Sequence, residues 1–144
     1  MKVLVACEFS GAVRDAFIRG WHEAMSCDLL PTEKPGKHIQ GDVLKILNGL
    51  PLCLKCNSMC ESDHNSFLCH KCGRLWPLSY PHKIGKWDLM IAHPPCTYLS
   101  RAGARWWGDA GRQVLANKAA EFVFKLRDAP IEKIAIENPI GQLN

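Results

Sequence analysis

One cysteine, Cys96, stands where a buried strand is expected to end. The apolar run 89–92 is short enough to be a strand buried on both faces, and Pro94 and Pro95 then stop it because proline lacks the donor that a sheet ladder needs. In an open α/β sheet, ligands bind at the carboxyl ends of the strands. The context therefore favours a nucleophile, although a cysteine without it is more often a small core residue.

A second polar group follows another apolar run in the same way. Residues 133–136 are predicted to form a strand, and Glu137 and Asn138 come directly after it, before Pro139. If the two strands are neighbours, Cys96 and Glu137 lie at adjacent strand ends, within reach of one substrate.

Two cysteine pairs have the spacing of a metal site. Twelve residues separate Cys53-x2-Cys56 from Cys69-x2-Cys72, and glycine follows the second pair. Two such knuckles place four thiolates tetrahedrally, which suits Zn²⁺.

The segment around these pairs, residues 51–83, is rich in Cys, His, Ser and Asn and shows little helical or strand periodicity. It is predicted to be a zinc-ribbon-like insertion, because about thirty residues have too little core to fold without such a staple. Cys60, His64 and His70 lie in or beside it, so one of them could replace a cysteine ligand. A purely structural ribbon is at least as consistent with this pattern as one that contacts DNA.

The segments on either side of the insertion, 1–50 and 84–144, are predicted to form one α/β domain. An acidic residue, Asp28 or Asp42, follows each of the second and third strands, as in a nucleotide-binding half-sheet. The expected elements are strands at 3–6, 22–27, 38–40, 89–92 and 133–136, helices at 12–19 and 112–127, and a helical turn at 43–47.

Two details of these helices are also predicted. Ser10 is expected to cap the first helix, and Gly11 is expected to let the backbone approach a ligand closely. The apolar faces are expected to be Val13, Ala16 and Phe17 on the first helix, and Leu115, Ala119, Phe122, Val123 and Leu126 on the second.

Composition sets broad limits on the class of protein. The chain has 144 residues, of which 47% are apolar, and a net charge of +4, which permits a nucleic-acid partner without requiring one. No apolar run approaches membrane-spanning length, and no signal peptide is seen, so we expect a cytoplasmic protein. Eight cysteines in a cytoplasmic chain indicate metal binding and a reactive thiol more than disulfides.

Four motifs, in order, resemble one enzyme family. Residues 94–103, Pro-Pro-Cys-Thr-Tyr-Leu-Ser-Arg-Ala-Gly, are similar to the nucleophile motif Pro-Pro-Cys-Gln-x-Phe-Ser-x-Ala-Gly of DNA (cytosine-5)-methyltransferases. Residues 137–141 resemble the family's Glu-Asn-Val-x-Gly, residues 41–43 its Gly-Asp-Ile, and residues 9–11 its Phe-x-Gly. The chain looks like the catalytic half of the small form found among bacteriophage and prophage proteins.

The resemblance implies a Rossmann-like S-adenosylmethionine-dependent methyltransferase sheet, truncated after its fifth strand, that acts on DNA in a bacterial host. Cys96 would be the nucleophile after Pro95, Glu137 the partner of the cytosine N3 atom, protonated in a dry pocket, and Asn138 would orient the loop. The cofactor would be held by Phe9, Ser10, Gly11, Asp28, Asp42 and Pro94. For the two aspartates, ordinary turn capping is the competing interpretation.

The departures from the family are also informative. Val13 stands where a second glycine is usual, Thr97 replaces glutamine, and the ribbon is an addition. The family's later strands and target recognition region lie beyond Asn144. We therefore expect little sequence-specific methylation by this chain alone, and expect a second chain or a C-terminal segment to supply target recognition.

Two other functions stay open. His93-Pro94-Pro95-Cys96 also resembles the Asp-Pro-Pro-Tyr motif of amino-methylating enzymes, which need no thiol. A non-catalytic, zinc-bearing DNA-binding protein is the third possibility. Residues 101–111, with Trp106 and Trp107, could be a lid that closes behind a flipped base, or the tryptophans could pack on the core.

Overall fold

The computed structural model describes residues 1–48, 53, 55–56, 60–63, 66–69, 71–77, 86–101 and 108–137. Its centre is a five-stranded, wholly parallel sheet with the strand order β3-β2-β1-β7-β8. The chain runs outward from β1 to β3 and then returns to the other side of β1, so a topological switch point lies between β1 and β7. The α/β class and the compatibility with a Rossmann-like fold are thereby confirmed.

Outside the inserted segment, the elements agree with the expected ranges to within about two residues at each end. They are β1 (Lys2–Ala6), α1 (Ala12–Arg19), β2 (Glu23–Asp28), β3 (His38–Gln40), α2 (Val43–Leu47), β4 (Cys60–Asp63), β5 (Ser66–Cys69), β6 (Leu75–Pro77), β7 (Leu89–Ala92), α3 (Ala110–Arg127) and β8 (Lys133–Ile136).

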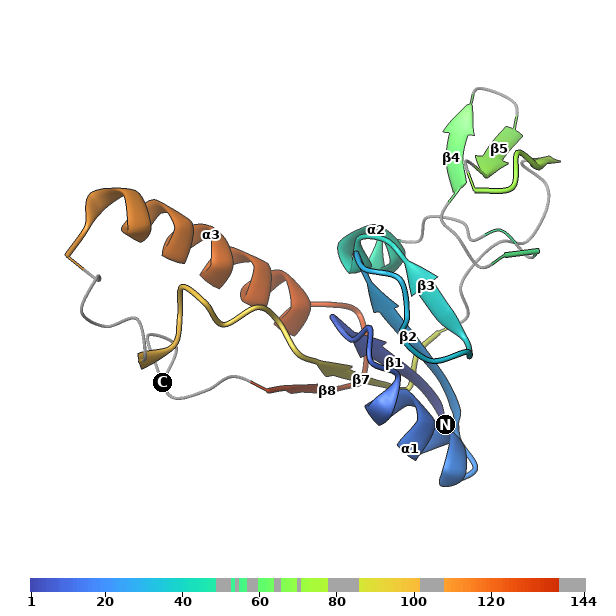
Figure 1. The fold of residues 1–144 in the computed structure, drawn as a ribbon, viewed down its shortest axis with the longest axis horizontal. Helices are drawn as coiled ribbons and strands as arrows, with labels where there is room; N and C mark the ends of the chain where they lie inside the picture. Colours follow the sequence, from blue (N-terminus) through green and yellow to red (C-terminus); the bar gives the residue numbers. More distant parts are fainter. Residues whose placement is uncertain are drawn as a thin grey trace.

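Helices cover both faces of the sheet (Figure 1). On one face, Leu4 and Met90 of the central strands pack in a buried cluster with Val43 of α2 and Leu126 of α3. On the other face, α1 packs against the second cluster, which includes Val3 and Val5 of the same central strand. Alternate residues of β1 therefore point into two separate cores, and this strand is buried on both sides.

The predicted helix faces are correct in part. Ala16 of α1 is exposed, and Leu115 of α3 is 41% exposed, whereas Ala116 beside it is buried. The buried positions of α3 are Ala116, Val123 and Leu126, which share one face because their spacings are close to whole helical turns. None of the described helices is long and apolar enough to cross a membrane.

The turn between β1 and α1 is built on a buried charged network. Glu8 is only 6% exposed, and its Oε1 accepts hydrogen bonds from the Val13 amide (2.8 Å) and the Ser10 hydroxyl (3.0 Å). Ser10 Oγ itself accepts from the Ala12 amide at 3.1 Å. The helix therefore has two side-chain acceptors at its first turn, where Ser10 alone was expected, while the N-cap residue is Gly11.

Arg14 of α1 is fully buried. Its guanidinium forms an ion pair with Asp15 (2.8 Å) and hydrogen bonds with the Ser26 hydroxyl (3.3 Å) and the Pro35 carbonyl (3.3 Å). It therefore fixes the segment between β2 and β3 against α1.

Gly11 is required by packing within the protein. Its φ of 74° lies in the left-handed region, and a Cβ atom there would overlap Nη2 of Arg14. The expected role of Gly11, close approach to a ligand, is thus not needed to explain this glycine.

We expect Gly11→Ala to destabilise the fold by about 1–2 kcal/mol from its left-handed backbone alone, and by more through the displaced Arg14. Gly108→Ala is the matched control, because nothing lies within 4 Å of its added Cβ atom. Urea denaturation of both variants measures the difference; equal midpoints would contradict this explanation.

The inserted segment contains a second, antiparallel sheet of β4, β5 and β6. In Figure 1, it lies beyond α2 and β3 at one end of the molecule. Strands were not predicted there, because the Cys- and Ser-rich sequence lacks the alternation of apolar and polar residues that marks a half-buried strand.

Candidate functional site

The carboxyl ends of four parallel strands enclose a pocket of about 170 Å³. It joins residues that follow strands far apart in the sequence and one residue of α3, as expected near a topological switch point. Its lining is Cys7, Cys27, Asp28, Leu29, Gly41, Asp42, Val43, Pro95 and Phe122. The structure therefore brings together three of the predicted site residues, namely Asp28, Asp42 and Pro95.

Both aspartates also stabilise local turns. Asp42 is the N-cap of α2 and accepts from the Leu44 amide at 2.9 Å, and Asp28 accepts from the Leu30 amide at 2.9 Å. Each uses Oδ1, and among the described residues Oδ2 of each has no hydrogen-bond partner. Capping and ligand binding, which were competing interpretations, are therefore compatible in both residues.

Two neutral thiols complete the polar lining of the pocket. Burial first, and then the charges of Asp28 and Asp42, raise the pKa of Cys7 to about 12. Burial also raises the pKa of Cys27, whose Sγ donates to the Gly41 carbonyl at 3.3 Å. Both groups stay protonated at neutral pH, so the charge in this pocket is negative and comes from the aspartates.

The remaining predicted cofactor residues do not line this pocket. Phe9 and Ser10 lie in the turn after β1. Phe9 is 36% exposed, and the Ser10 hydroxyl accepts a hydrogen bond from the first residue of α1. Gly11 packs on Arg14, and Pro94 is buried immediately before Pro95.

The backbone around Cys96 forms a tight turn after β7. The Cys96 carbonyl accepts from the amides of Leu99 (3.0 Å) and Ser100 (2.9 Å), and Leu99 is fully buried. Arg112 of α3 donates to the Thr97 carbonyl at 2.8 Å. Buried Leu99 and Arg112 of α3 thus fix the turn that carries Cys96. Cys96 is half-buried and directly follows Pro95, which lines the pocket.

Glu137 directly follows β8, the strand next to β7, as predicted. β7 and β8 are paired in parallel, and the Glu137 amide donates to the Ala92 carbonyl at 2.9 Å. Its Oε2 is 3.7 Å from Nδ1 of His93, yet its side chain is 67% exposed. The dry surroundings expected for this carboxyl group are therefore not seen, and Asn138 lies outside the described residues.

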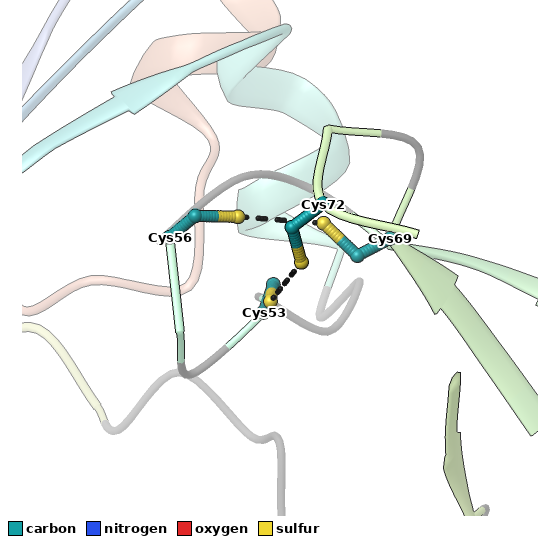
Figure 2. Close-up of side chains that lie close together, drawn as sticks. All are labelled: Cys53, Cys56, Cys69 and Cys72. Atoms are coloured by element: carbon teal, nitrogen blue, oxygen red, sulfur yellow. Dashed lines mark hydrogen bonds between the residues drawn. The ribbon is translucent and has the colours of Figure 1, made fainter. Parts of the chain in front are cut away.

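The four predicted metal ligands converge in the inserted segment, residues 51–83. Figure 2 shows the side chains of Cys53, Cys56, Cys69 and Cys72 pointing toward one another. Their sulfur atoms all lie within 4.8 Å of one another, with separations of 3.5 Å for Cys53–Cys72 and 3.4 Å for Cys56–Cys69. A zinc ion at about 2.3 Å from each sulfur places tetrahedral ligands about 3.8 Å apart. These cysteines could therefore hold a metal ion such as zinc.

Backbone amides of the knuckles stabilise the charged form of the sulfur atoms. Burial alone would raise the pKa of Cys53, but hydrogen bonds from the Cys56 and Lys55 amides and from two thiols lower it to about 6. The amides of Cys72 and Lys71 act on Cys69 in the same direction, but burial and the hydrogen bonds with the Cys56 and Cys72 thiols outweigh them and raise its pKa to about 12. Thiolates are the form that binds metal, so these amides favour occupation of the site.

Cys60 is a neighbour of the cluster. It is opposite Cys69 in the β4–β5 pairing and is buried, and burial, followed by the charge on Cys53, raises its pKa to about 11. The group of four sulfur atoms that lie within 4.8 Å of one another is complete without it. His64 and His70 lie outside the described residues.

Sequence reasoning missed several residues of the site. Cys7, Cys27 and Phe122 line the pocket, and Arg112 anchors the turn of Cys96. Cys7 and Cys27 stand at the ends of the first two strands, so their positions alone could have suggested them. No sequence signal marks the contact of Arg112, which depends on how α3 returns across the sheet.

The proposed lid, residues 101–111, is described only at its two ends. Residues 102–107, including both tryptophans, lie outside the described residues. At the ends of this segment, Arg101 is exposed, and Asp109 accepts from the Arg112 amide at 2.7 Å as the N-cap of α3.

Comparisons with known proteins identify no relative: no family model, no curated protein and no solved structure matches this chain.

Proposed function

We propose that the chain is the catalytic part of a DNA methyltransferase that uses S-adenosylmethionine and modifies carbon 5 of cytosine. The observation that carries the proposal is the acidic pocket at the strand ends, with Cys96 one residue beyond its wall.

The pocket favours a nucleoside over a phosphate-bearing cofactor. Asp28 and Asp42 accept hydrogen bonds, and the described residues that line the pocket include no lysine or arginine. An aspartate after the second strand is where a ribose hydroxyl is bound in this class of sheet. The pocket, at about 170 Å³, is smaller than a typical ligand site of about 300–1,000 Å³, so it suits the nucleoside part of a larger molecule.

The start of α1 argues further against a dinucleotide. In nucleotide-binding sheets, a pyrophosphate lies at the N-terminus of the first helix, above a glycine-rich turn. Here the Glu8 carboxylate accepts the Val13 amide at that end of the helix, and the turn 7–13 contains a single glycine. A buried carboxylate there repels phosphate, whereas the positively charged sulfonium of S-adenosylmethionine carries no such penalty.

The chemistry proposed for Cys96 begins with its thiolate. Addition of Sγ to carbon 6 of cytosine breaks the aromaticity of the ring and makes carbon 5 nucleophilic, with Glu137 as hydrogen-bond partner at N3. Carbon 5 would then attack the methyl group of S-adenosylmethionine, so that a bond from carbon 5 to the methyl group forms as the sulfonium–methyl bond breaks and S-adenosylhomocysteine leaves. A base then removes the proton from carbon 5 as the bond between Sγ and carbon 6 breaks, which restores the ring and the free cysteine.

The partner implied by this proposal is DNA, with the target base flipped out of the duplex. Residues that read a target sequence would come from a second chain or a further C-terminal segment. The net charge of +4 supports weak, salt-dependent DNA contact, while sequence reading needs contacts to base edges. For the four cysteines of the inserted segment, we propose zinc as the metal.

Asp42→Asn is expected to weaken S-adenosylmethionine binding by about 1–3 kcal/mol, because an amide keeps the N-cap but loses the charged acceptor. Asp109→Asn, at the N-cap of α3, is the matched control and leaves affinity unchanged. Equilibrium dialysis with tritiated cofactor measures both. Equal affinities for the two variants and the unmodified chain would remove Asp42 from the site.

DNA that contains 5-fluorocytosine separates the two methylation chemistries. Release of the enzyme requires a base to remove the hydrogen at carbon 5. A base cannot remove fluorine from that position, so an enzyme that attacks carbon 6 stays covalently attached. We expect an adduct that survives denaturing electrophoresis and requires cofactor. Methylation of ordinary DNA without any such adduct would instead indicate an amino-methylating enzyme, and DNA binding without cofactor binding would indicate a non-catalytic protein.

A further inference from the structure

A second cavity, of about 350 Å³, lies between the parallel sheet and the metal-binding unit. Thr32, His38 and Gln40 line it from the β2–β3 side, and Lys55, Cys56 and Lys71 line it from the knuckles. This basic cleft is separate from the acidic pocket, yet Gln40 is followed directly by Gly41 and Asp42, which line that pocket.

The two lysines occupy equivalent places in the sequence. Each is the residue immediately before the second cysteine of a Cys-x2-Cys pair, so the two knuckles present both lysines to the same cleft. Both side chains belong to exposed residues, and in the described part of the chain neither has an ion-pair partner. Among the described residues that line the cleft, none is acidic.

Backbone amides, and not the lysine side chains, donate the hydrogen bonds that stabilise the sulfur atoms of the metal site. The amides of Lys55 and Cys56 already donate to Cys53, and those of Lys71 and Cys72 donate to Cys69. The ammonium groups are therefore available to an anion in the cleft, where they act as point charges with several donors each.

The opposite wall is rigid and polar. His38 Nδ1 lies 2.9 Å from the Ser26 hydroxyl and its Nε2 lies 3.0 Å from the Leu30 carbonyl, while Thr32 Oγ1 donates to the Lys34 carbonyl at 2.9 Å. The buried Arg14 holds this wall from beneath through Thr32 and Pro35. Gln40 is exposed and uses one of its amide hydrogens in a 3.3 Å contact with the Leu29 carbonyl, so the other can reach a ligand.

We propose that the basic cleft binds a phosphodiester of the nucleic-acid backbone. Two cations and the free amide hydrogen of Gln40, with no Phe, Tyr or Trp among the described lining residues, suit phosphate oxygens and give no means of reading bases. The two knuckles form one wall of the cleft, so the role of the metal site is to position Lys55 and Lys71 opposite β3. The identity of the ligand as nucleic acid rests on the proposed function.

The test compares two charge-matched double variants of the full, zinc-loaded chain. Lys55→Gln with Lys71→Gln removes the cleft cations, and Lys118→Gln with Lys133→Gln removes two exposed lysines of α3 and β8. Fluorescence anisotropy with a labelled 20-base-pair DNA is measured from 50 to 300 mM NaCl, without S-adenosylmethionine. We expect the cleft variant to bind at least about tenfold more weakly at 100 mM salt and to lose about two from the salt-dependence slope.

A third variant protects the test from loss of the knuckles. Gln40→Glu places a carboxylate in the cleft from the sheet side and is expected to weaken DNA binding even if the lysine variant loses zinc, which elemental analysis detects. Unchanged DNA affinity in the cleft variants, an equal loss in both lysine pairs, or no DNA binding by the unmodified chain would overturn the proposal.

Inorganic phosphate distinguishes a small-anion site. If the cleft variants lose affinity for phosphate but not for DNA, the cleft binds free anions and the proposal is wrong. S-adenosylmethionine titrations of the same variants are expected to be unchanged, so a failure of the proposed methyltransferase function would appear there independently of the DNA result.

Discussion

Replacing Cys96 by serine is expected to abolish methyl transfer while leaving cofactor binding intact. A serine hydroxyl at neutral pH is far less nucleophilic than a thiolate, and loss of a catalytic nucleophile costs on the order of 10⁴-fold or more in turnover. The acidic pocket is lined by Pro95 and not by Cys96, so affinity for S-adenosylmethionine is expected to stay the same.

The readouts are the covalent adduct with 5-fluorocytosine DNA and the incorporation of tritium into ordinary DNA. Thr97→Ala is the neighbouring control, because this exposed residue contributes its backbone carbonyl, and not its side chain, to the contact with Arg112. Retained turnover in Cys96→Ser would contradict the cytosine-5 mechanism and favour transfer to an amino group.

Loss of the metal is expected to have the second large effect. Structural zinc sites in small units contribute about 10–16 kcal/mol of apparent binding free energy, which is also folding free energy. Replacing both Cys53 and Cys56 by serine is expected to remove one zinc per chain and to unfold β4–β6. The parallel sheet has its own two buried clusters and is expected to remain folded.

Elemental analysis and hydrogen exchange test this together. Amides of β4–β6 are expected to lose protection, and those of β1 and β7 to keep it. Cys60→Ser is the control, since Cys60 is buried beside the cluster but is not one of its four ligands. Zinc lost in that variant, zinc retained in the double variant, or loss of protection throughout the sheet would contradict this account.

The parallel sheet could be predicted because its signals are local. Short runs such as 89–92 and 133–136, apolar except for Lys133, are long enough only for strands, and a proline follows each within three residues. The convergence of Asp28, Asp42 and Pro95 follows from the same reasoning, because parallel strands bring their carboxyl ends to one edge. The four cysteines converged as expected because their spacing alone specifies two knuckles.

What could not be predicted depends on contacts between distant elements. Arg14 and Glu8 are buried, although charged residues are mostly exposed, because each finds partners in a turn or a neighbouring segment. Leu115 was expected in the core, but α3 presents Ala116 there, since the approach of a helix to its sheet is a tertiary property. The basic cleft could not be predicted, because it depends on how the knuckles pack against β3, and no local sequence pattern indicates that packing.

Isothermal titration of the unmodified chain with S-adenosylmethionine, and separately with NAD⁺, is the measurement that tests the central claim most directly. The acidic pocket and the Glu8 carboxylate at the start of α1 predict binding of one S-adenosylmethionine per chain and no detectable binding of NAD⁺. Absence of heat with S-adenosylmethionine at millimolar concentration, or equal affinity for both ligands, would contradict the assignment of this pocket and with it the proposed methyltransferase function.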